Sequence, residues 1–311
     1  MKELILISGS GRSGSTIIDL LVAQIDGVFS VGEIMYIWDR GLRDGWKCSC
    51  GELVSECNVW REILFDAYGD KYLDRSFVDK VIQLRSRATS VRSLFGGIVS
   101  SEVKKCRKEY REIMQRLYSS VYKITRCKVI IDSSKEPGNA FLLKSFSDFN
   151  VHVVHLVRSP FGVAYSWTKD VKNKALEEKS LPTEGVFFSS LEWLVVNSIL
   201  LAKSKRLSSK LVEYESFAHN PKKSIQYLIS SVDPIRCSSL QFIQKNDVSI
   251  KTKIHSVSGN PCRFEVKNTI TIKADDKWKR ELPLTSKLIV GITSFPFLLF
   301  KSVFKKINER I

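Results

Sequence analysis

A glycine-rich segment near the start of the chain has the residue types and spacing to bind a phosphate group. It reads SGSGRSGST over residues 8–16, between the apolar runs 4–7 and 17–22. The first run has the length of a buried strand, and the second begins a helix. In such a strand-to-helix turn, successive backbone N–H groups surround a concavity at the positive end of the helix dipole. We therefore predict an anion-binding loop here.

The loop departs from the ATP-binding P-loop at one position. Gly9 and Gly14, with four residues between them, and Thr16 in the hydroxyl position match the ATP-type spacing. Ser15 stands where a nucleoside triphosphatase has its lysine, and Arg12 is the only cation of the loop. Because that lysine contacts the β- and γ-phosphates, its absence favours a nucleotide with no γ-phosphate to cleave. The alternative is a turn that only connects a strand to a helix.

A second cation with a hydroxyl partner follows a later apolar run. Arg158 opens the segment RSPFGVAYS, which ends at Ser166. Pro160 favours a helix start, which places Ser166 about two turns into the helix and near Arg158. A guanidinium and a hydroxyl so placed form a second anion site apart from the loop. Two such sites predict a nucleotide with two separate phosphate groups, although Arg158 alone is also typical of a surface ion pair.

Four apolar, β-branched runs separated by helical segments must position these residues. The runs lie at 4–7, 128–131, 151–157 and 210–212. Strands that are buried on both faces and separated by helices form the βαβ units of a parallel sheet. We therefore predict an α/β fold of the P-loop type, in which a central parallel sheet is flanked by helices in three layers.

Polar clusters follow three of these predicted strands, at 8–16, 132–135 and 158–160. Ligands of open parallel sheets bind at the carboxyl ends of the strands, so these clusters are predicted to converge on one edge. Residues 40–126, between the first and second predicted strands, are helical in pattern and rich in Lys and Arg. We expect this insertion to supply the substrate side of the site.

Size and charge favour one domain with an anionic partner. The chain has 311 residues, and 49 Lys and Arg against 33 Asp and Glu give a net charge of +16. We expect a single domain over 1–311 with a C-terminal helix at about 284–307. The apolar run 288–304 predicts a helix packed on the core, and a membrane-surface helix is the alternative. With seven cysteines and no secretory signal before the first predicted strand, we expect a reduced, cytoplasmic protein.

Three cysteines lie close together in the sequence. Cys48, Cys50 and Cys57 supply three thiols and no CxxC pair, so a tetrahedral metal site lacks a ligand. We therefore predict structural cysteines and no metal. His152 and His155 lie on one predicted strand and are expected to be packed rather than to bind a metal.

Together, the two anion-binding motifs resemble those of sulfotransferases that use 3′-phosphoadenosine-5′-phosphosulfate (PAPS). In that family a loop of the form Arg-Ser-Gly-Thr/Ser-Thr holds the 5′-phosphosulfate, and a later Arg with a Ser at the same interval holds the 3′-phosphate. Residues 12–16 match the first motif, and Arg158 with Ser166 match the second. The arginine form of the loop is similar to carbohydrate and tyrosylprotein enzymes and to many bacterial homologues, whereas cytosolic small-molecule enzymes carry lysine. The resemblance extends from the N-terminus to about residue 280.

The resemblance also implies catalytic residues. In the tyrosylprotein-type enzymes a glutamate at this interval after the loop arginine is the catalytic base, and Glu33 stands at that position. Alternatively, Glu33 caps a helix or lies on the surface as a solvated carboxylate. Arg12 is expected to stabilise the bridging oxygen as charge develops on it. Lys135 lies where cytosolic relatives carry their catalytic histidine segment, and it is expected either to contact the sulfonate or to be solvated.

Two further residues are implied to contact the nucleotide. Tyr214 lies in a Tyr-Glu segment like one that contacts the nucleotide in relatives, and Arg263 lies in a late polar loop, 255–264. Asp170 departs from the pattern, since some tyrosylprotein-type enzymes have an arginine there. The predicted nucleotide-binding residues are Gly11, Arg12, Ser13, Gly14, Ser15, Thr16, Arg158, Ser166, Tyr214 and Arg263.

We therefore predict a metal-independent sulfotransferase that transfers the sulfuryl group of PAPS to a hydroxyl acceptor and releases 3′,5′-adenosine bisphosphate (PAP). The basic charge leads us to expect a carbohydrate or glycolipid acceptor, with peripheral contact at the inner membrane surface and no nucleic-acid partner. One alternative is a P-loop kinase in which Asp132, after the run 128–131, acts as a Walker B aspartate. The other is a non-catalytic, basic anion-binding module.

Overall fold

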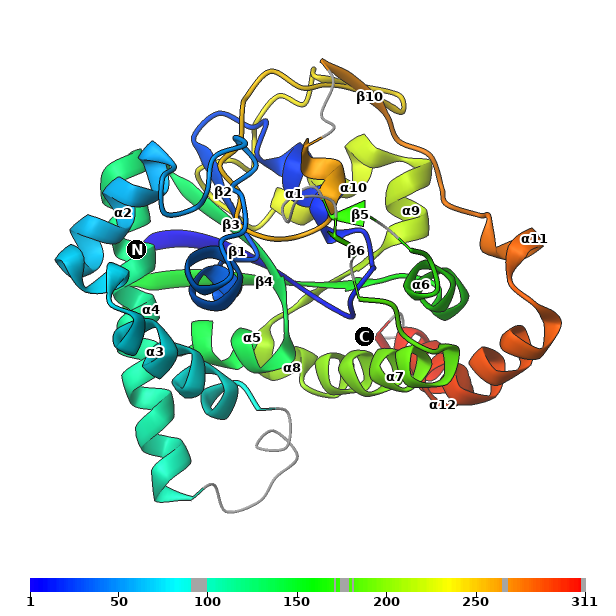
Figure 1. The fold of residues 1–311 in the computed structure, drawn as a ribbon. Coiled ribbons are helices and arrows are strands. Elements are labelled where there is room, and N and C mark those ends of the chain that lie inside the picture. Colours follow the sequence, from blue (N-terminus) through cyan, green and yellow to red (C-terminus); the bar gives the residue numbers. More distant parts are fainter. Residues whose placement is uncertain (91–99, 171, 174–178, 181, 265–267, 309–311) are drawn as a thin grey trace.

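The computed structural model describes residues 1–90, 100–170, 172–173, 179–180, 182–264 and 268–308 (Figure 1). Its centre is a five-stranded sheet with the strand order β2-β3-β1-β4-β7, and every neighbouring pair of strands is parallel. The strands are β1 (Lys2–Ser8), β2 (Val28–Gly32), β3 (Val129–Lys135), β4 (Phe149–Val157) and β7 (Lys210–Glu213). The predicted α/β fold with a central parallel sheet is confirmed.

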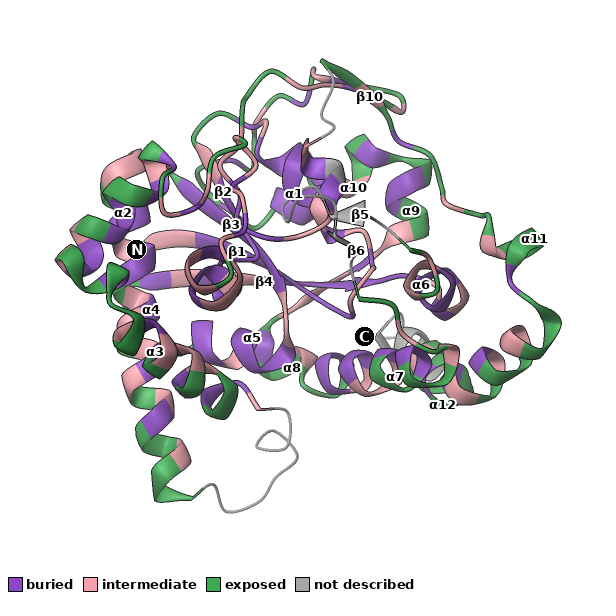
Figure 2. Ribbon diagram, viewed as in Figure 1, coloured by how far each residue is buried: buried purple, intermediate pink, exposed green. Residues whose placement is uncertain are grey.

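Helices cover both faces of the sheet because side chains alternate along each strand. Leu4 and Leu6 of β1 pack into one apolar core, whereas Ile5 and Ile7 pack into another on the opposite face. The strands are buried almost throughout (Figure 2). Helices on the first face are α2 (Asn58–Tyr68), α3 (Arg75–Ala88), α4 (Ser101–Thr125) and α5 (Pro137–Leu143). Those on the second face are α1 (Ser15–Val22), α9 (Tyr214–His219) and α10 (Pro221–Ile229).

The remaining elements lie around this three-layer core. The helices are α6 (Pro160–Trp167), α7 (Val186–Ala202), α8 (Ser204–Leu207), α11 (Trp278–Glu281) and α12 (Leu284–Asn308). Short helical turns are η1 (Ile34–Tyr36), η2 (Ile37–Arg43), η3 (Gly69–Leu73) and η6 (Pro261–Phe264). Two small antiparallel sheets join β5 (Lys172–Asn173) with β6 (Lys179–Ser180), and β8 (Ile243–Gln244), β9 (Asp247–Ser249) and β10 (Thr269–Thr271).

The strand β2 is a correction to the sequence prediction. It lies at the edge of the sheet and pairs with β3, so the insertion 40–126 follows the second strand of the chain rather than the first. Its apolar pattern is interrupted by Ser30, which is buried and donates to the Asp19 carboxylate at 2.7 Å. A buried polar residue with a partner is stable in a strand but hides the strand from a hydrophobicity pattern. Residues 91–99 of the insertion lie outside the described residues.

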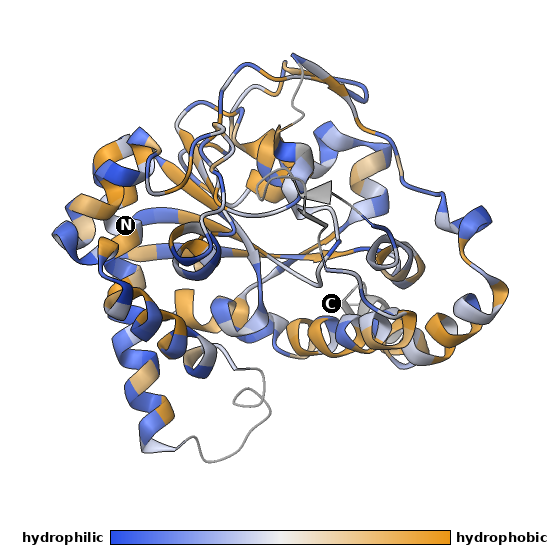
Figure 3. Ribbon diagram, viewed as in Figure 1, coloured by the Kyte–Doolittle hydropathy of each residue, from blue (hydrophilic) through white to orange (hydrophobic). Residues whose placement is uncertain are grey.

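The helix α12 packs on α7 by a narrow stripe and leaves most of its apolar side chains exposed. Phe297 is buried and meets Trp193 of α7 edge-to-face, with ring centroids 4.9 Å apart. Ile292 and Phe295 are 76% and 62% exposed. Figure 3 shows both helices as largely hydrophobic. Within the described residues, the segment Leu284–Ser302 has the length and hydropathy to cross a membrane, and 17% of it is buried.

Candidate active site

The glycine-rich loop connects β1 to α1 and is packed closely by aromatic side chains. Gly14 has a φ of 90°, a left-handed conformation that favours glycine. A Cβ atom at Gly14 would approach the Tyr214 ring to 2.6 Å, and one at Gly11 would approach the Trp167 ring to 2.7 Å. These close approaches fix the backbone path, so the loop is formed before any ligand binds.

The hydroxyl residues of the loop have separate roles. Ser13 donates from its hydroxyl to the Ser10 carbonyl at 2.6 Å, which braces the loop from within. Ser15 and Thr16 are the first residues of α1, whose leading N–H groups lack partners inside the helix. The Thr16 hydroxyl accepts the backbone N–H of Asn260 at 3.4 Å. The loop therefore offers backbone N–H groups at a positive helix end, as an anion site requires.

Arg12 is the cation of this loop. Its φ of 60° is left-handed, and its guanidinium lies over the Trp167 ring at 4.9 Å from the centroid. Burial lowers the pKa of Arg12, and the charge of Glu33 opposes that shift. An arginine stays protonated under such perturbation. Its guanidinium makes no ion pair with the described residues, so its charge is available to an anionic ligand.

The second predicted anion site lies at the carboxyl end of β4. Arg158 is 6% exposed and donates to the Arg12 carbonyl at 3.0 Å, which ties it to the first site. The same guanidinium pairs with Asp275 at 3.0 Å and lies 4.7 Å from the centroid of the Tyr214 ring. Arg158 is therefore held in place by the loop, an aromatic ring and a carboxylate.

Ser166 lies on the same helix face as this guanidinium. A Cβ atom at Gly162 would lie 3.0 Å from Nε of Arg158, so Arg158 packs against the first turn of α6. Gly162 and Ser166 are four residues apart, and such positions share a helix face. The half-buried Ser166 follows Gly162 by one turn on that face. The structure thus brings Arg158 and Tyr214 together next to the loop, and Ser166 follows one helical turn after Gly162.

Glu33 follows β2 and lies in a cluster of cations. It is 5% exposed, pairs with the ammonium of Lys135, and pairs with Arg40 at 3.1 Å. Ser258 donates a further hydrogen bond to it at 3.3 Å. Burial raises the pKa of Glu33, but the charges of Lys135 and Arg40 outweigh burial and lower it below its ordinary value. Glu33 is therefore an ionised carboxylate at neutral pH rather than a capping or surface carboxylate.

Lys135 connects Glu33 to the loop through its backbone as well as its side chain. Its carbonyl accepts the N–H of Gly9 at 3.0 Å and the hydroxyl of Ser8 at 2.6 Å. Its φ of 70° is left-handed, which is uncommon for a residue with a side chain. Such a conformation marks a position that its surroundings over-determine. The ammonium is thereby held against Glu33 instead of being solvated.

Asp132 is buried and fully engaged within the fold. It accepts hydrogen bonds from the Tyr118 hydroxyl at 2.6 Å and from the Ser134 N–H at 2.7 Å, and both its oxygens have partners. It is 0% exposed, and burial raises its pKa to about 6. A carboxylate so enclosed braces β3 and does not suit the role of an exposed magnesium ligand.

The late loop lies against Glu33 and the phosphate-binding loop. Val257 accepts the Glu33 N–H at 2.8 Å, and a Cβ atom at Gly259 would lie 3.6 Å from the Thr16 hydroxyl. Arg263 is buried and donates to the carbonyl of Ser256 at 3.1 Å and to that of Lys47 at 2.8 Å. These contacts give Arg263 a role in holding the loop, which differs from the predicted contact with the nucleotide.

The sequence prediction did not include Arg40. This residue lies in the π-helical turn η2, and its guanidinium is 3.9 Å from the centroid of the Tyr36 ring and 5.1 Å from that of Trp46. It donates to the Ser258 hydroxyl at 2.8 Å in addition to its ion pair with Glu33. No spacing rule pointed to Arg40, because residues 34–43 form a 3-10 turn and a π-helical turn rather than an α-helix.

Comparison with known proteins identifies the fold. No protein-family model and no curated protein matches the chain. The sulfotransferase domain from the Synechococcus PCC 7002 olefin synthase is similar in structure, with a TM-score of 0.50, 17% sequence identity, and coverage of 95% of this chain and 94% of that chain. The sulfotransferase domain from the curacin biosynthetic pathway has a TM-score of 0.49, 16% identity, and coverage of 94% and 98%. The chain therefore has the fold of a sulfotransferase domain.

Proposed function

We propose that this chain is a sulfotransferase that transfers the sulfuryl group of PAPS to a hydroxyl group of an acceptor. The observation that carries the proposal is the link between the two anion sites, in which Arg158 donates to the backbone carbonyl of Arg12 at 3.0 Å. A ligand with one phosphate at the loop and another at Arg158 satisfies both sites. The fold of a sulfotransferase domain supports this assignment.

The residues present fit PAPS as co-substrate. The N–H groups of the loop from Gly11 to Thr16, with the guanidinium of Arg12, suit the 5′-phosphosulfate. Arg158 and Ser166 suit the 3′-phosphate, and the Tyr214 ring closes the space between the two sites. A side chain at Gly14 would clash with the Tyr214 ring, which supports a cradle built from backbone. Bound PAPS supplies an activated sulfuryl group.

The side chains around Glu33 suit the other half of the reaction. The ionised Glu33 takes the proton of the acceptor hydroxyl as its oxygen attacks, because the hydroxyl becomes acidic while its bond to sulfur forms. Lys135, beside Glu33, contributes positive charge near the transferring group, and Arg12 stabilises the departing bridging oxygen. The lowered pKa makes Glu33 a weak base, so its effect depends on positioning rather than basicity.

The surroundings of Asp132 disfavour the kinase alternative. Both carboxylate oxygens of Asp132 are taken up by hydrogen bonds within the fold, to Tyr118 and to Ser134, which leaves neither aimed at a ligand in the glycine-rich loop. A non-catalytic anion-binding module leaves the ion pair between Glu33 and Lys135 without a role. Neither alternative accounts for a buried carboxylate between two cations at the end of β2.

The acceptor in this proposal is a carbohydrate or glycolipid. Tyr36 and Trp46 enclose Arg40 beside Glu33, and this mixture of aromatic and polar groups suits a hydroxylated ring. The exposed apolar face of α12 supports peripheral binding at a membrane, and the net charge of +16 supports an anionic lipid surface. The six cysteines whose side chains the structure describes form no disulfide with one another, which is compatible with the cytoplasmic location that forms part of this proposal.

The test is PAP release from PAPS with pooled glycan and glycolipid acceptors and no added metal. We expect wild-type protein to release PAP, and Arg12→Ala to release none while its circular dichroism is unchanged. Transfer from ATP in the presence of magnesium, with none from PAPS, overturns the proposal. Sedimentation with anionic vesicles tests membrane contact: Ile292→Glu should reduce binding, and equal binding of both proteins contradicts this part.

A further inference from the structure

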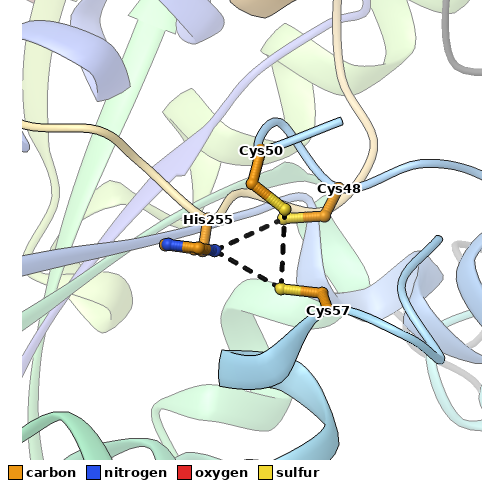
Figure 4. A group of neighbouring side chains, drawn as sticks. All are labelled: Cys48, Cys50, Cys57 and His255. Carbon is orange, nitrogen blue, oxygen red and sulfur yellow. Dashed lines mark hydrogen bonds between the residues drawn. The ribbon is translucent and has the colours of Figure 1, made fainter. Parts of the chain in front are cut away.

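Three cysteines and a histidine meet on the insertion side of Glu33 (Figure 4). Cys48, Cys50 and Cys57 come from the start of the insertion, and His255 comes from the late loop, 198 positions from Cys57. The four ligand atoms, three Sγ and one imidazole nitrogen, lie within 4.8 Å of one another. The sequence predicted no metal because only three ligands were evident. The imidazole of His255 supplies a fourth ligand atom.

Three of the six distances between ligand atoms lie close to those of a tetrahedral zinc site, and the other three are at most 4.8 Å. Zn–S bonds of about 2.3 Å and Zn–N bonds of about 2.0–2.1 Å place ligand atoms about 3.8 Å apart for two sulfurs and about 3.6 Å apart for sulfur and nitrogen. Sγ of Cys50 is 3.7 Å from Sγ of Cys57. Nδ1 of His255 is 3.3 Å from Sγ of Cys57 and 3.9 Å from Sγ of Cys48. Three thiols and one imidazole form one of the common structural zinc ligand sets.

The surrounding backbone holds these ligands in place. Ser49, between the first two cysteines, donates from its hydroxyl to the Ile254 carbonyl at 2.7 Å and accepts the Ser256 N–H at 2.9 Å, so both neighbours of His255 are fixed. Trp60 donates from its indole to the His255 carbonyl at 2.6 Å. Contacts of this kind orient metal ligands in structural sites.

Burial also suits a closed structural site. Cys48 is 0% exposed and Cys57 is 1% exposed, while Cys50 and His255 are half-buried. No position is left open for a substrate, because the protein supplies all four ligands.

We propose that Cys48, Cys50, Cys57 and His255 bind one zinc ion that fastens the late loop to the insertion. On binding, the cysteine thiols lose their protons to solvent and the neutral imidazole coordinates through Nδ1. No electron is transferred. The zinc ion would complete the attachment that Ser49 and Arg263 already make between the two segments.

This site would act on the proposed reaction only by positioning. Two residues after His255, Val257 accepts the Glu33 N–H at 2.8 Å and donates to the Val31 carbonyl at 3.1 Å. Ser258 then reaches both Glu33 and Arg40. Loss of zinc should therefore loosen the loop that holds the candidate base and faces Thr16.

The experiment measures metal in the purified full chain, kept under reducing conditions, by elemental mass spectrometry. We expect one zinc per chain in the wild type, and Cys50→Ser and His255→Ala to retain about tenfold less or lower still after dialysis against a chelator. Cys237→Ser changes an exposed cysteine and is the matched control, which should keep the wild-type zinc content. Cobalt added to metal-stripped protein should give a thiolate-to-cobalt absorption band in the wild type and not in His255→Ala.

Three results overturn the proposal. The first is a wild-type protein that binds neither zinc nor cobalt. The second is a Cys50→Ser variant that retains as much zinc as the wild type. The third is a peptide mass map that locates a disulfide between Cys50 and Cys57 in protein purified without reductant, since that bond removes two ligands. Because zinc content is measured without nucleotide, these outcomes are independent of the proposed sulfotransferase function. Limited proteolysis of 255–264 in zinc-loaded and stripped protein then tests the positioning role.

Discussion

Arg158→Ala should weaken binding of PAP far more than binding of adenosine 5′-monophosphate (AMP), which lacks the 3′-phosphate. Hydrogen bonds to a charged group contribute about 1.5–3 kcal/mol each. Removing the guanidinium from a phosphate should therefore raise the Kd of PAP by about 10- to 150-fold. We expect an increase in Kd toward the upper end of this range because Arg158 is 6% exposed, so solvent does not fully screen its interaction with the phosphate.

AMP is the internal control for damage to the loop. The substitution also removes the donor to the Arg12 carbonyl and the ion pair to Asp275, both at 3.0 Å. If those losses distort the loop, AMP and PAP should weaken by the same factor. Titration calorimetry with both ligands separates the two effects, and Arg236→Ala, which removes an exposed pair to Asp233, should change neither Kd. Equal Kd ratios for PAP and AMP in Arg158→Ala would refute a 3′-phosphate site at this residue.

Three further substitutions test other parts of the account. Arg12→Ala should abolish sulfuryl transfer while the unfolding midpoint in urea stays near that of the wild type; wild-type activity contradicts its role at the leaving oxygen. Glu33→Gln should keep PAP binding and lower kcat by about 100-fold or more. Because the pKa of Glu33 is lowered, the kcat of the wild type should not fall with acid until below about pH 4.5. A fall in wild-type kcat near neutral pH, or an unchanged kcat in the variant, excludes Glu33 as the base. Burial raises the pKa of Asp19 from 3.8 to about 7, so the folded chain holds a proton that the unfolded chain releases, and stability falls as pH rises from about 4 to about 7. Between about pH 5 and about pH 8, Asp19→Asn should remove about 3 kcal/mol of that decline, measured by urea unfolding at the two pH values. An unchanged pH dependence contradicts the assignment.

The strands that sequence predicted are those with uninterrupted apolar residues. β1, β3 and β4 are buried on both faces, so the apolar run was a sufficient signal. β7 lies at one edge of the sheet and only its Val212 is buried, yet Leu211 and Val212 were enough to mark it. β2 lies at the sheet edge and carries Ser30, whose hydrogen bond to Asp19 joins residues on different elements. A hydrophobicity pattern does not contain that pairing.

Within the candidate site, the glycine-rich turn between β1 and α1 was predictable because its sequence signal is local. The loop glycines, Arg12 and the start of α1 all lie within residues 9–16. Two of the three described side-chain partners of Glu33 were not local, since Lys135 comes from β3 and Ser258 from the late loop, whereas Arg40 is seven residues away. His255 is likewise far in sequence from the three cysteines that it lies beside. From sequence alone, the three thiols therefore looked like a metal site that lacks its fourth ligand. Arg263 was assigned to the nucleotide from its loop, whereas its donors meet backbone carbonyls.

The most direct test of the central claim is calorimetric titration of the full chain with PAP in the absence of magnesium, beside ATP with magnesium. The two anion sites linked through Arg158 and Arg12 predict tight binding of PAP and no binding of ATP. Binding of ATP with magnesium, and none of PAP, would contradict the sulfotransferase assignment and make the loop a nucleoside triphosphate site.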